Sequence, residues 1–203
     1  MLLIEHAGAR TVLYGTLVAG ALAEVITTYW RRGSIREALP IGRGHAPADR
    51  GTKQVLVLAM VAGIFAAALI AEHWPGLRAG ANTWRTLVIG TVILGIGVGL
   101  RVWAVWTLGR FFRREVAIFA DQTVVESGPY RWVRHPAYTG DLLIAFGFGL
   151  AWGSWVGAAV ALVVTLAGHL PRILVEEAAL REALGDAYES YARGRARLVP
   201  GVW

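Results

Sequence analysis

Cysteine is absent from the 203 residues, so disulfide bonds, thiolate metal ligands and a cysteine nucleophile are excluded. No strand–helix–strand pattern surrounds the glycine run Gly95-Ile-Gly-Val-Gly99, which therefore predicts close helix packing and not a nucleotide-binding turn. His73 follows Glu72 without further ligands at metal-site spacing, so no metal is predicted. The first residues also lack a basic segment followed by a small-residue cleavage site, and we expect the first apolar segment to be retained.

Charge is scarce as well. Charged residues make up 17% of the chain and hydrophobic residues 56%, and the mean hydropathy is +0.50, which together predict an all-α integral membrane protein. Long apolar stretches occupy residues 11–30, 55–73, 86–108 and 137–171. The last stretch is too long for one span, so we expect a break near Gly153-Ser154 that makes a tight helical hairpin. These stretches predict about five transmembrane helices in a single membrane domain, residues 1–203.

The basic residues alternate in density between successive loops. Residues 31–54, 109–136 and 172–203 hold six, five and five of them, whereas residues 74–85 hold two and the first segment one. The positive-inside rule then predicts the N-terminus outside and the C-terminus in the cytoplasm. The net charge of +6 points to this orientation and to anionic headgroups before nucleic acid. Glu24, inside the first apolar stretch, is a candidate functional carboxylate unless it reaches the interface.

A polar, turn-rich stretch at residues 126–140 lies between two apolar segments. Gly128-Pro129 is a turn signal, and Pro136 suits the first position of a helix. Arg134 and His135 would then lie at the positive end of that helix, where free backbone N–H groups favour an anionic ligand. The alternative is an interfacial loop that only anchors the chain to headgroups.

The last apolar segment ends in a cluster of charges. Pro171 predicts a kink where the helix leaves the membrane. Arg172 and Glu176 are spaced i,i+4, as are Glu177 and Arg181, so two surface salt bridges would explain them without any function. The basic, aromatic tail that follows either lies on anionic headgroups or folds back over residues 126–140.

These elements resemble the isoprenylcysteine carboxyl methyltransferase family. The resemblance is carried by LGRFF at 108–112, GPYRWVRHPAYTG at 128–140, Arg172 with Glu176 and Glu177, GDAYESY at 185–191 and RLVP at 197–200. The wider superfamily also includes phospholipid N-methyltransferases and, more distantly, membrane sterol reductases. The resemblance covers a methyltransferase-like core at residues 101–200, while residues 1–100 would be variable N-terminal spans. His169 and Pro171 depart from the family pattern.

The resemblance implies an S-adenosylmethionine site built from the loop before the fourth span and a cytoplasmic C-terminal helical segment. The implied cofactor-binding residues are Arg134, His135, Tyr138, Gly140, Glu176 and Glu177. The implied substrate-binding residues are Arg172, Tyr188, Tyr191, Arg195 and Arg197, with Arg172 and Glu177 as the catalytic residues. The acceptor would be a lipophilic isoprenoid or lipid, and no metal or nucleic acid is implied.

The acceptor chemistry has two alternatives. A carboxylate is already ionised at neutral pH and needs no base, so Arg172 would position it by paired hydrogen bonds. An amine must lose a proton, and Glu176 or Glu177 would be the base. Two further functions stay open: an NADPH-dependent reductase like the sterol-reducing relatives, and a lipid-binding membrane protein without catalysis.

Overall fold

The computed structural model describes residues 51–78, 83–112 and 122–203, with single positions at Gly8, Thr11, Tyr14, Gly15 and Val18. The expected first span at 11–30, Glu24 and most of the loop at 31–54 lie outside the described residues. The described part is helical. Its elements are α2 (Thr52–His73), η3 (Pro75–Leu77), α3 (Thr83–Leu108), η4 (Gly109–Phe111), η5 (Gly128–Arg131), α4 (Pro136–Ala151), α5 (Trp155–Leu184) and α6 (Asp186–Arg193).

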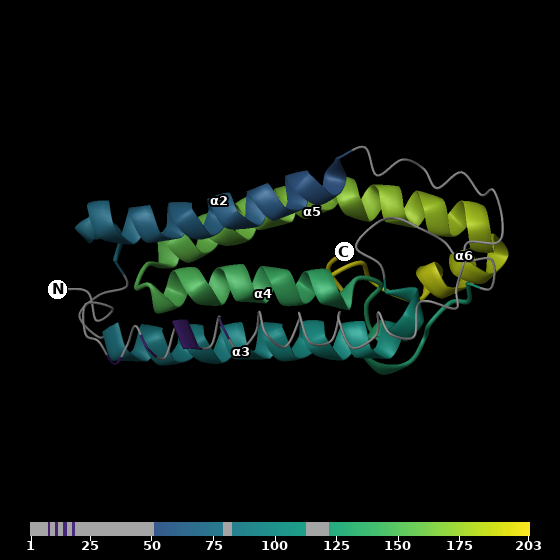
Figure 1. Cartoon of the computed structure of the whole chain (residues 1–203), viewed down its shortest axis with the longest axis horizontal. Coiled ribbons are helices and arrows are strands. Elements are labelled where there is room, and N and C mark those ends of the chain that lie inside the picture. Colours follow the sequence, from purple (N-terminus) through teal and green to yellow (C-terminus); the bar gives the residue numbers. More distant parts are fainter. Residues whose placement is uncertain are drawn as a thin grey trace.

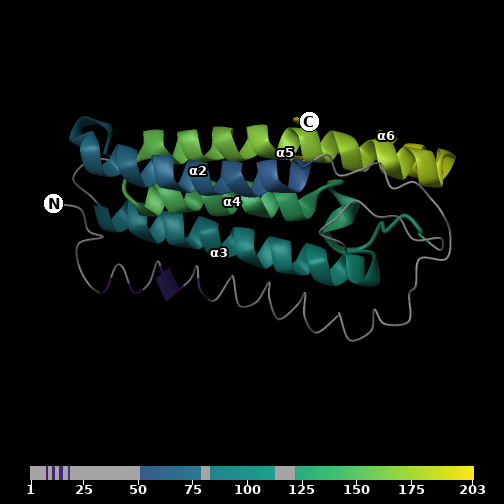
Figure 2. The same cartoon turned by 45° about the horizontal axis from the view of Figure 1, so that its top comes forward.

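The short helix α4 is the centre of the bundle. It packs between α3 on one side and the pair formed by α2 and α5 on the other (Figure 1). The long helix α5 extends past the ends of the other helices and leads into α6 (Figure 2). The end of α3, the start of α4 and the second half of α5 therefore meet at one end of the bundle.

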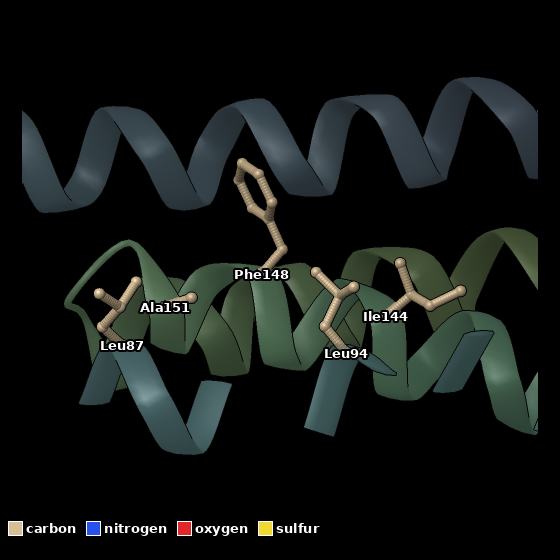
Figure 3. Packing of buried hydrophobic residues seen from close by; sticks show 5 residues of the cluster. All are labelled: Leu87, Leu94, Ile144, Phe148 and Ala151. Atoms are coloured by element: carbon tan, nitrogen blue, oxygen red, sulfur yellow. The ribbon is translucent and has the colours of Figure 1, made fainter. Parts of the chain in front are cut away.

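The apolar core follows the interface between α3 and α4. Leu87 and Leu94 of α3 pack against Ile144, Phe148 and Ala151 of α4 (Figure 3). In the same view, Phe148 points from α4 toward α2, so one side chain joins two helix interfaces.

Glycines allow the backbones of α3 and α4 to approach closely. A Cβ atom on Gly147 would lie 2.6 Å from the Leu94 nitrogen and 2.7 Å from the Gly90 oxygen, and Gly97 faces Gly140 in the same way. The close packing predicted for the run Gly95–Gly99 is confirmed for Gly97. It is wrong for Gly95 and Gly99, because no atom of the described residues lies within 4 Å of a Cβ added at either position.

The helical hairpin forms where the sequence predicts it. α4 ends at Ala151 and α5 begins at Trp155, with Gly153 at a φ of 96° in the turn. Ser154 caps α5 by accepting a hydrogen bond from the Gly157 amide at 3.0 Å, and its hydroxyl donates to the Leu77 carbonyl oxygen at 2.8 Å. Pro171 does not end the helix, since α5 continues through it to Leu184.

Three described helices, α2, α3 and α5, are long and apolar enough to cross a membrane. α4 has 16 residues, which at ~1.5 Å per residue is shorter than a hydrocarbon core of ~30 Å. It is largely buried among its neighbours. The count of five spans stays a prediction, because the first of them lies outside the described residues.

Exposed tryptophans mark two levels along the bundle. Trp84 and Trp103 on α3 are exposed and lie ~29 Å apart along the helix axis, close to the thickness of a hydrocarbon core. Trp155 begins α5 at the Trp84 end, and Trp132 packs edge-on against Trp103 with ring centroids 5.7 Å apart. Because tryptophan concentrates at membrane boundaries, the end of α3 and the start of α4 lie at such a boundary.

The contact between α3 and α4 gives a first prediction. Gly147→Ala places a methyl group against the backbone of α3, so we expect a loss of about 1–3 kcal/mol of stability. Gly95→Ala is the matched control, because no atom lies within 4 Å of its added Cβ. Thermal unfolding in detergent measures both variants, and equal midpoints for Gly147→Ala and Gly95→Ala would contradict this packing.

Candidate active site

The polar stretch folds into a short 3-10 turn, η5, that leads into α4. Gly128 begins this turn with a φ of 56°, and α4 begins at Pro136 as predicted. The turn lies over the end of α3, since Tyr130 packs against Ala104 and Ala137.

The C-terminal tail folds back over this stretch, which confirms the second of its two expected placements. The amides of Arg134 and His135 donate to the carbonyl oxygens of Ala196 and Arg197 at 2.9 and 3.0 Å. Thr139 donates its hydroxyl to the Leu198 carbonyl oxygen at 2.8 Å. These two amides are therefore bonded to the chain's own carbonyl groups, and the expectation of free backbone N–H groups at the start of this helix does not hold for them.

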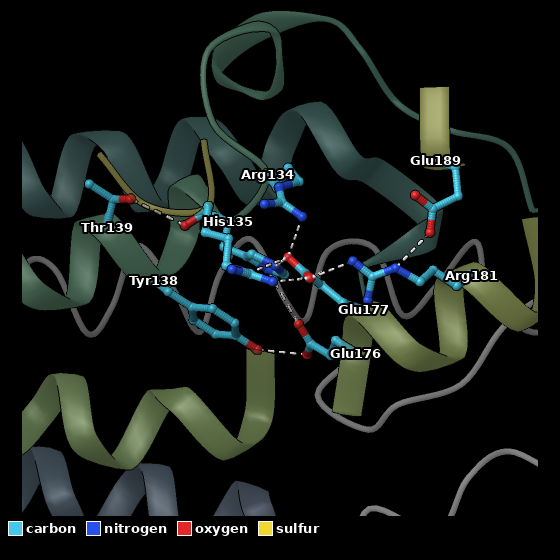
Figure 4. Close-up of polar contacts among 9 residues, drawn as sticks. Arg134, His135, Tyr138, Thr139, Glu176, Glu177, Arg181 and Glu189 are labelled. Carbon is cyan, nitrogen blue, oxygen red and sulfur yellow. Dashed lines mark hydrogen bonds and ion pairs between the residues drawn. The ribbon is translucent and has the colours of Figure 1, made fainter. Parts of the chain in front are cut away.

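Glu177 is the centre of the ionic contacts that fix the tail. Its side chain is fully buried, and its carboxylate lies 2.7 Å from Arg134 Nη1, 3.0 Å from Arg181 Nη2 and 3.1 Å from Arg197 Nε (Figure 4). His135 Nε2 lies 3.3 Å from the same carboxylate. One buried acid thus joins the loop before α4, helix α5 and the tail.

Glu176 forms a second centre one residue earlier. Its Oε1 accepts a hydrogen bond from the Tyr138 hydroxyl at 2.6 Å and another from Arg172 Nε at 2.7 Å. His135 stacks on the Tyr138 ring, with centroids 5.6 Å apart, and its Nδ1 lies 3.7 Å from Glu176 Oε2. The contact between Glu176 and Arg172 confirms one predicted i,i+4 pair.

The pair of Glu177 and Arg181 confirms the other i,i+4 prediction. The explanation of both pairs as surface salt bridges is wrong, however, because Arg172 is 2% exposed and Glu177 is fully buried. Of the four partners, Arg181 has the largest exposed fraction of side chain, 40%. Buried ion pairs of this kind are costly to form, so their presence points to a role beyond stability.

A cavity of about 310 Å³ opens beside the Glu176 centre, between the start of α2 and the end of α3. Seven of the residues implied by the family resemblance line it: Arg134, His135, Tyr138, Arg172, Glu176, Tyr188 and Tyr191. Apolar walls come from Leu56 and Val57 on α2 and from Phe111 and Phe112 after α3. The cavity thus combines ionised groups of both signs with an apolar side.

Four other implied residues lie outside the lining. Gly140 faces α3, where an added Cβ would lie 2.7 Å from the Gly97 oxygen. Glu177 lies behind the wall, among its basic partners. Arg195 pairs with Glu126 at 2.7 Å, and Arg197 bonds Glu177 and covers the ring of Trp203. These positions support the wall and do not face the ligand space.

Sequence reasoning missed three charged lining residues: Lys53, Arg101 and Asp141. Arg101 Nη1 donates to Asp141 Oδ2 at 2.7 Å, and His169 Nε2 lies 3.1 Å from the same oxygen. Asp141 is a carboxylate within the apolar stretch 137–171, and the rule that singled out Glu24 applies equally to it. Among the described residues, no group of three His, Asp or Glu side chains could hold a metal ion.

Tyr188 and Tyr191 of α6 are buried tyrosines outside the membrane-spanning helices. Burial, followed by the nearby charge of Glu177, raises the pKa of Tyr188 to about 12, against an opposing effect of Arg134. Burial also raises the pKa of Tyr191 above its usual value, and the Tyr191 hydroxyl donates to the Tyr130 carbonyl oxygen at 2.9 Å. Both hydroxyl groups therefore stay protonated at neutral pH.

With this geometry in place, the chain can be compared with known proteins. The model of one family, phospholipid methyltransferase, matches residues 85–187, from the start of α3 into α6. The match covers half of the chain and includes both acidic centres. The chain belongs to the phospholipid methyltransferase family.

Relatives of this phospholipid methyltransferase family member carry more specific names. A probable protein-S-isoprenylcysteine O-methyltransferase of Oryza sativa subsp. indica is 34% identical over 112 residues, which are 54% of this chain and 59% of the relative. Protein-S-isoprenylcysteine O-methyltransferase A of Arabidopsis thaliana is 31% identical over 131 residues, 64% of this chain and 65% of the relative. The matched part is less than two thirds of either relative.

The fold of this family member also has a solved counterpart. The structure of the eukaryotic intramembrane Ras methyltransferase, an isoprenylcysteine carboxyl methyltransferase, superposes with a TM-score of 0.60 and 24% identity. The superposition covers 72% of this chain and 52% of the other. The two proteins share the arrangement of their membrane helices.

The buried acid gives a second prediction. Glu177→Gln leaves Arg134 and Arg197 without their counter-charge, so we expect a loss of about 3–5 kcal/mol and release of the tail. Thermal unfolding and limited proteolysis after α6 measure the two effects. Glu189→Gln is the control, because Glu189 pairs with the part-exposed Arg181 and is itself 46% exposed. A stable Glu177→Gln protein with a protected tail would show that the acid does not hold the tail.

Proposed function

We propose that this protein transfers a methyl group from S-adenosylmethionine to the carboxylate of a lipophilic acceptor at the membrane boundary. Family membership and the names of the relatives support methyl transfer. The isoprenylcysteine relatives favour an acceptor that carries an isoprenoid chain beside a carboxylate.

The cavity fits the proposed donor in its chemistry. The donor has an ammonium group, a carboxylate and a cationic sulfur, and the wall supplies Glu176 for positive charge and Arg134 for negative charge. Three buried polar atoms of lining residues, Arg134 Nε, Gln122 Oε1 and the Tyr188 hydroxyl oxygen, have no hydrogen-bond partner among the described residues. Buried polar groups without partners are rare, so these three atoms support a ligand in the cavity. When bound, the donor would supply an electrophilic methyl group.

The position of the cavity suits an acceptor that comes from the bilayer. Its lining on α3 and after it runs from Arg101 to Phe112, on both sides of the Trp103 level, and includes the apolar Leu56 and Val57 of α2. A water-soluble donor would enter from the aqueous side and a lipid chain from the membrane side. With the N-terminus outside, as the basic loops predict, this end of the bundle faces the cytoplasm.

The hydrogen bonds accepted by Glu176 and Asp141, the two acids that line the cavity, are the observation that favours a carboxylate acceptor. Glu176 accepts hydrogen bonds from Tyr138 and Arg172, and Asp141 accepts one from Arg101 and lies beside His169. Donors that stabilise the ionised form make an acid a poor proton acceptor. An amine acceptor needs a base, whereas a carboxylate needs none, so the site favours carboxyl O-methylation over phospholipid N-methylation.

The roles of the site residues follow from their positions. Arg172, at the cavity wall, would orient the acceptor carboxylate through hydrogen bonds from its guanidinium. Glu177, behind the wall, would hold Arg134 and His135 in place, and Tyr188 and Tyr191 would close the aqueous side. Alignment and exclusion of water would account for most of the acceleration.

The choice of acceptor is tested by isotope transfer. Protein in nanodiscs is incubated with methyl-labelled S-adenosylmethionine and either S-farnesylcysteine or phosphatidylethanolamine. We expect label in the S-farnesylcysteine product that alkali releases as methanol, because a methyl ester is base-labile and an N-methyl group is not. Label that appears in phosphatidylethanolamine and resists alkali would favour the amine reaction.

The assignment of the donor is tested by binding. We expect S-adenosylhomocysteine, but not NADPH, to raise the unfolding temperature, and Glu176→Gln to weaken binding about tenfold through loss of a charge-assisted contact. Glu182→Gln is the control, because Glu182 lies on the same helix and is exposed. Stabilisation by NADPH alone would favour a reductase, and stabilisation by neither compound would favour a lipid-binding protein without catalysis.

A further inference from the structure

Three ionisable side chains meet on the membrane side of the cavity. Arg101 comes from α3, Asp141 from α4 and His169 from α5. His169 lies seven positions before Glu176 on α5, which places it ~10 Å deeper along the helix axis. Ionisable groups at membrane depth are costly to bury and are functional candidates. Neither the family pattern nor the proposed reaction assigns a role to His169.

The contacts of His169 indicate which of its ring nitrogens carry a hydrogen. Its Nδ1 lies 2.7 Å from the Thr165 carbonyl oxygen, which can only accept, so Nδ1 carries a hydrogen. Its Nε2 faces Asp141 Oδ2 at 3.1 Å. Two lone pairs would repel each other at this distance, so a second proton lies between Nε2 and Oδ2. Arg101 Nη1 also donates to Oδ2, at 2.7 Å.

This pair is connected to the site through one ring. Tyr138 packs edge-on against His169, with centroids 5.0 Å apart, while His135 stacks on it at 5.6 Å. The hydroxyl group of the same tyrosine donates to Glu176 at 2.6 Å. The position of Glu176 in the cavity therefore depends on a ring held between two histidines.

We propose that Asp141 and His169 are positioning residues that share a proton and thereby hold Tyr138, and through it Glu176, in the geometry that binds the donor. This inference rests on the proposed function. Loss of the proton at alkaline pH would place the Nε2 lone pair against the carboxylate and loosen the ring. Among the described residues, the titratable and charged groups that contact the pair are Arg101 from α3 and Tyr138 from α4. From α2, the residues against the adjoining Gly168 are Val55, Leu56 and Ala59, which do not titrate.

The proton count is tested directly by nitrogen NMR. The full-length protein is labelled with ¹⁵N-histidine, and the signal of His169, one of five histidines, is assigned by its loss in His169→Gln. We expect both ring nitrogens to carry a hydrogen at pH 7. In Asp141→Asn the amide can donate to Nε2, so we expect a single ring hydrogen there. A wild-type ring with one hydrogen at pH 7 would overturn the proposal.

The positioning role is tested by the pH dependence of binding. We expect the affinity of the wild type for S-adenosylhomocysteine to fall about tenfold as the His169 signal loses its second hydrogen. Asp141→Asn should bind with an affinity that does not change over this pH range. If the affinity for S-adenosylhomocysteine changed with pH equally in the wild type and in Asp141→Asn, the contact between Asp141 and His169 would only join helices.

A structural control separates stability from positioning. Ser154→Ala removes buried hydrogen bonds at the opposite end of the bundle, so it should lower the unfolding temperature and leave the pH profile of binding unchanged. A change in that profile would count against the proposal. Absence of any binding by the wild type would instead refute the proposed function, and the nitrogen signals would still decide whether Asp141 and His169 share a proton.

Discussion

The buried carboxylate of Glu177 is the contact on which the site depends. It brings together arginines from the loop before α4, from α5 and from the C-terminal tail. Removing one partner of a buried ion pair is strongly destabilising, because it leaves an uncompensated charge. The tail and the loop are therefore coupled through this acid, and the tail supports the loop residues that line the cavity.

The membrane helices also position the residues that line the cavity. α4 has only 16 residues, yet its first turn must place His135 and Tyr138 beside α5. Close contact through Gly147 and Gly97 brings it against α3, and the hairpin at Gly153 returns the chain as α5. These contacts give a rigid platform at the level of the boundary tryptophans, which suits a reaction between a soluble donor and a lipid.

The arrangement of charge suits methyl transfer better than proton transfer. Both acids that line the cavity among the described residues are held by cationic or hydroxyl donors, so they offer fixed charge and orientation. Such a site accelerates a displacement by alignment and by exclusion of water. The proton that we propose His169 shares with Asp141 also serves orientation, because it holds the ring of Tyr138, whose hydroxyl donates to Glu176.

The sequence by itself determined the local features. Apolar run lengths predicted α2, α3 and the hairpin, Pro136 predicted the start of α4, and i,i+4 spacing predicted the pairs of Arg172 with Glu176 and of Glu177 with Arg181. Helical periodicity fixes which neighbours on one helix can touch, so these contacts need no knowledge of the rest of the chain.

Only the tertiary structure decided how the helices face one another. The rotation of α4 about its axis turned Gly147 toward α3 and brought Asp141 to Arg101 and His169, contacts that span 40 and 28 residues. It also decided that Arg134 and Arg197 share the carboxylate of Glu177 behind the cavity wall. Such contacts depend on how three helices pack together, and no spacing within a single segment encodes that packing.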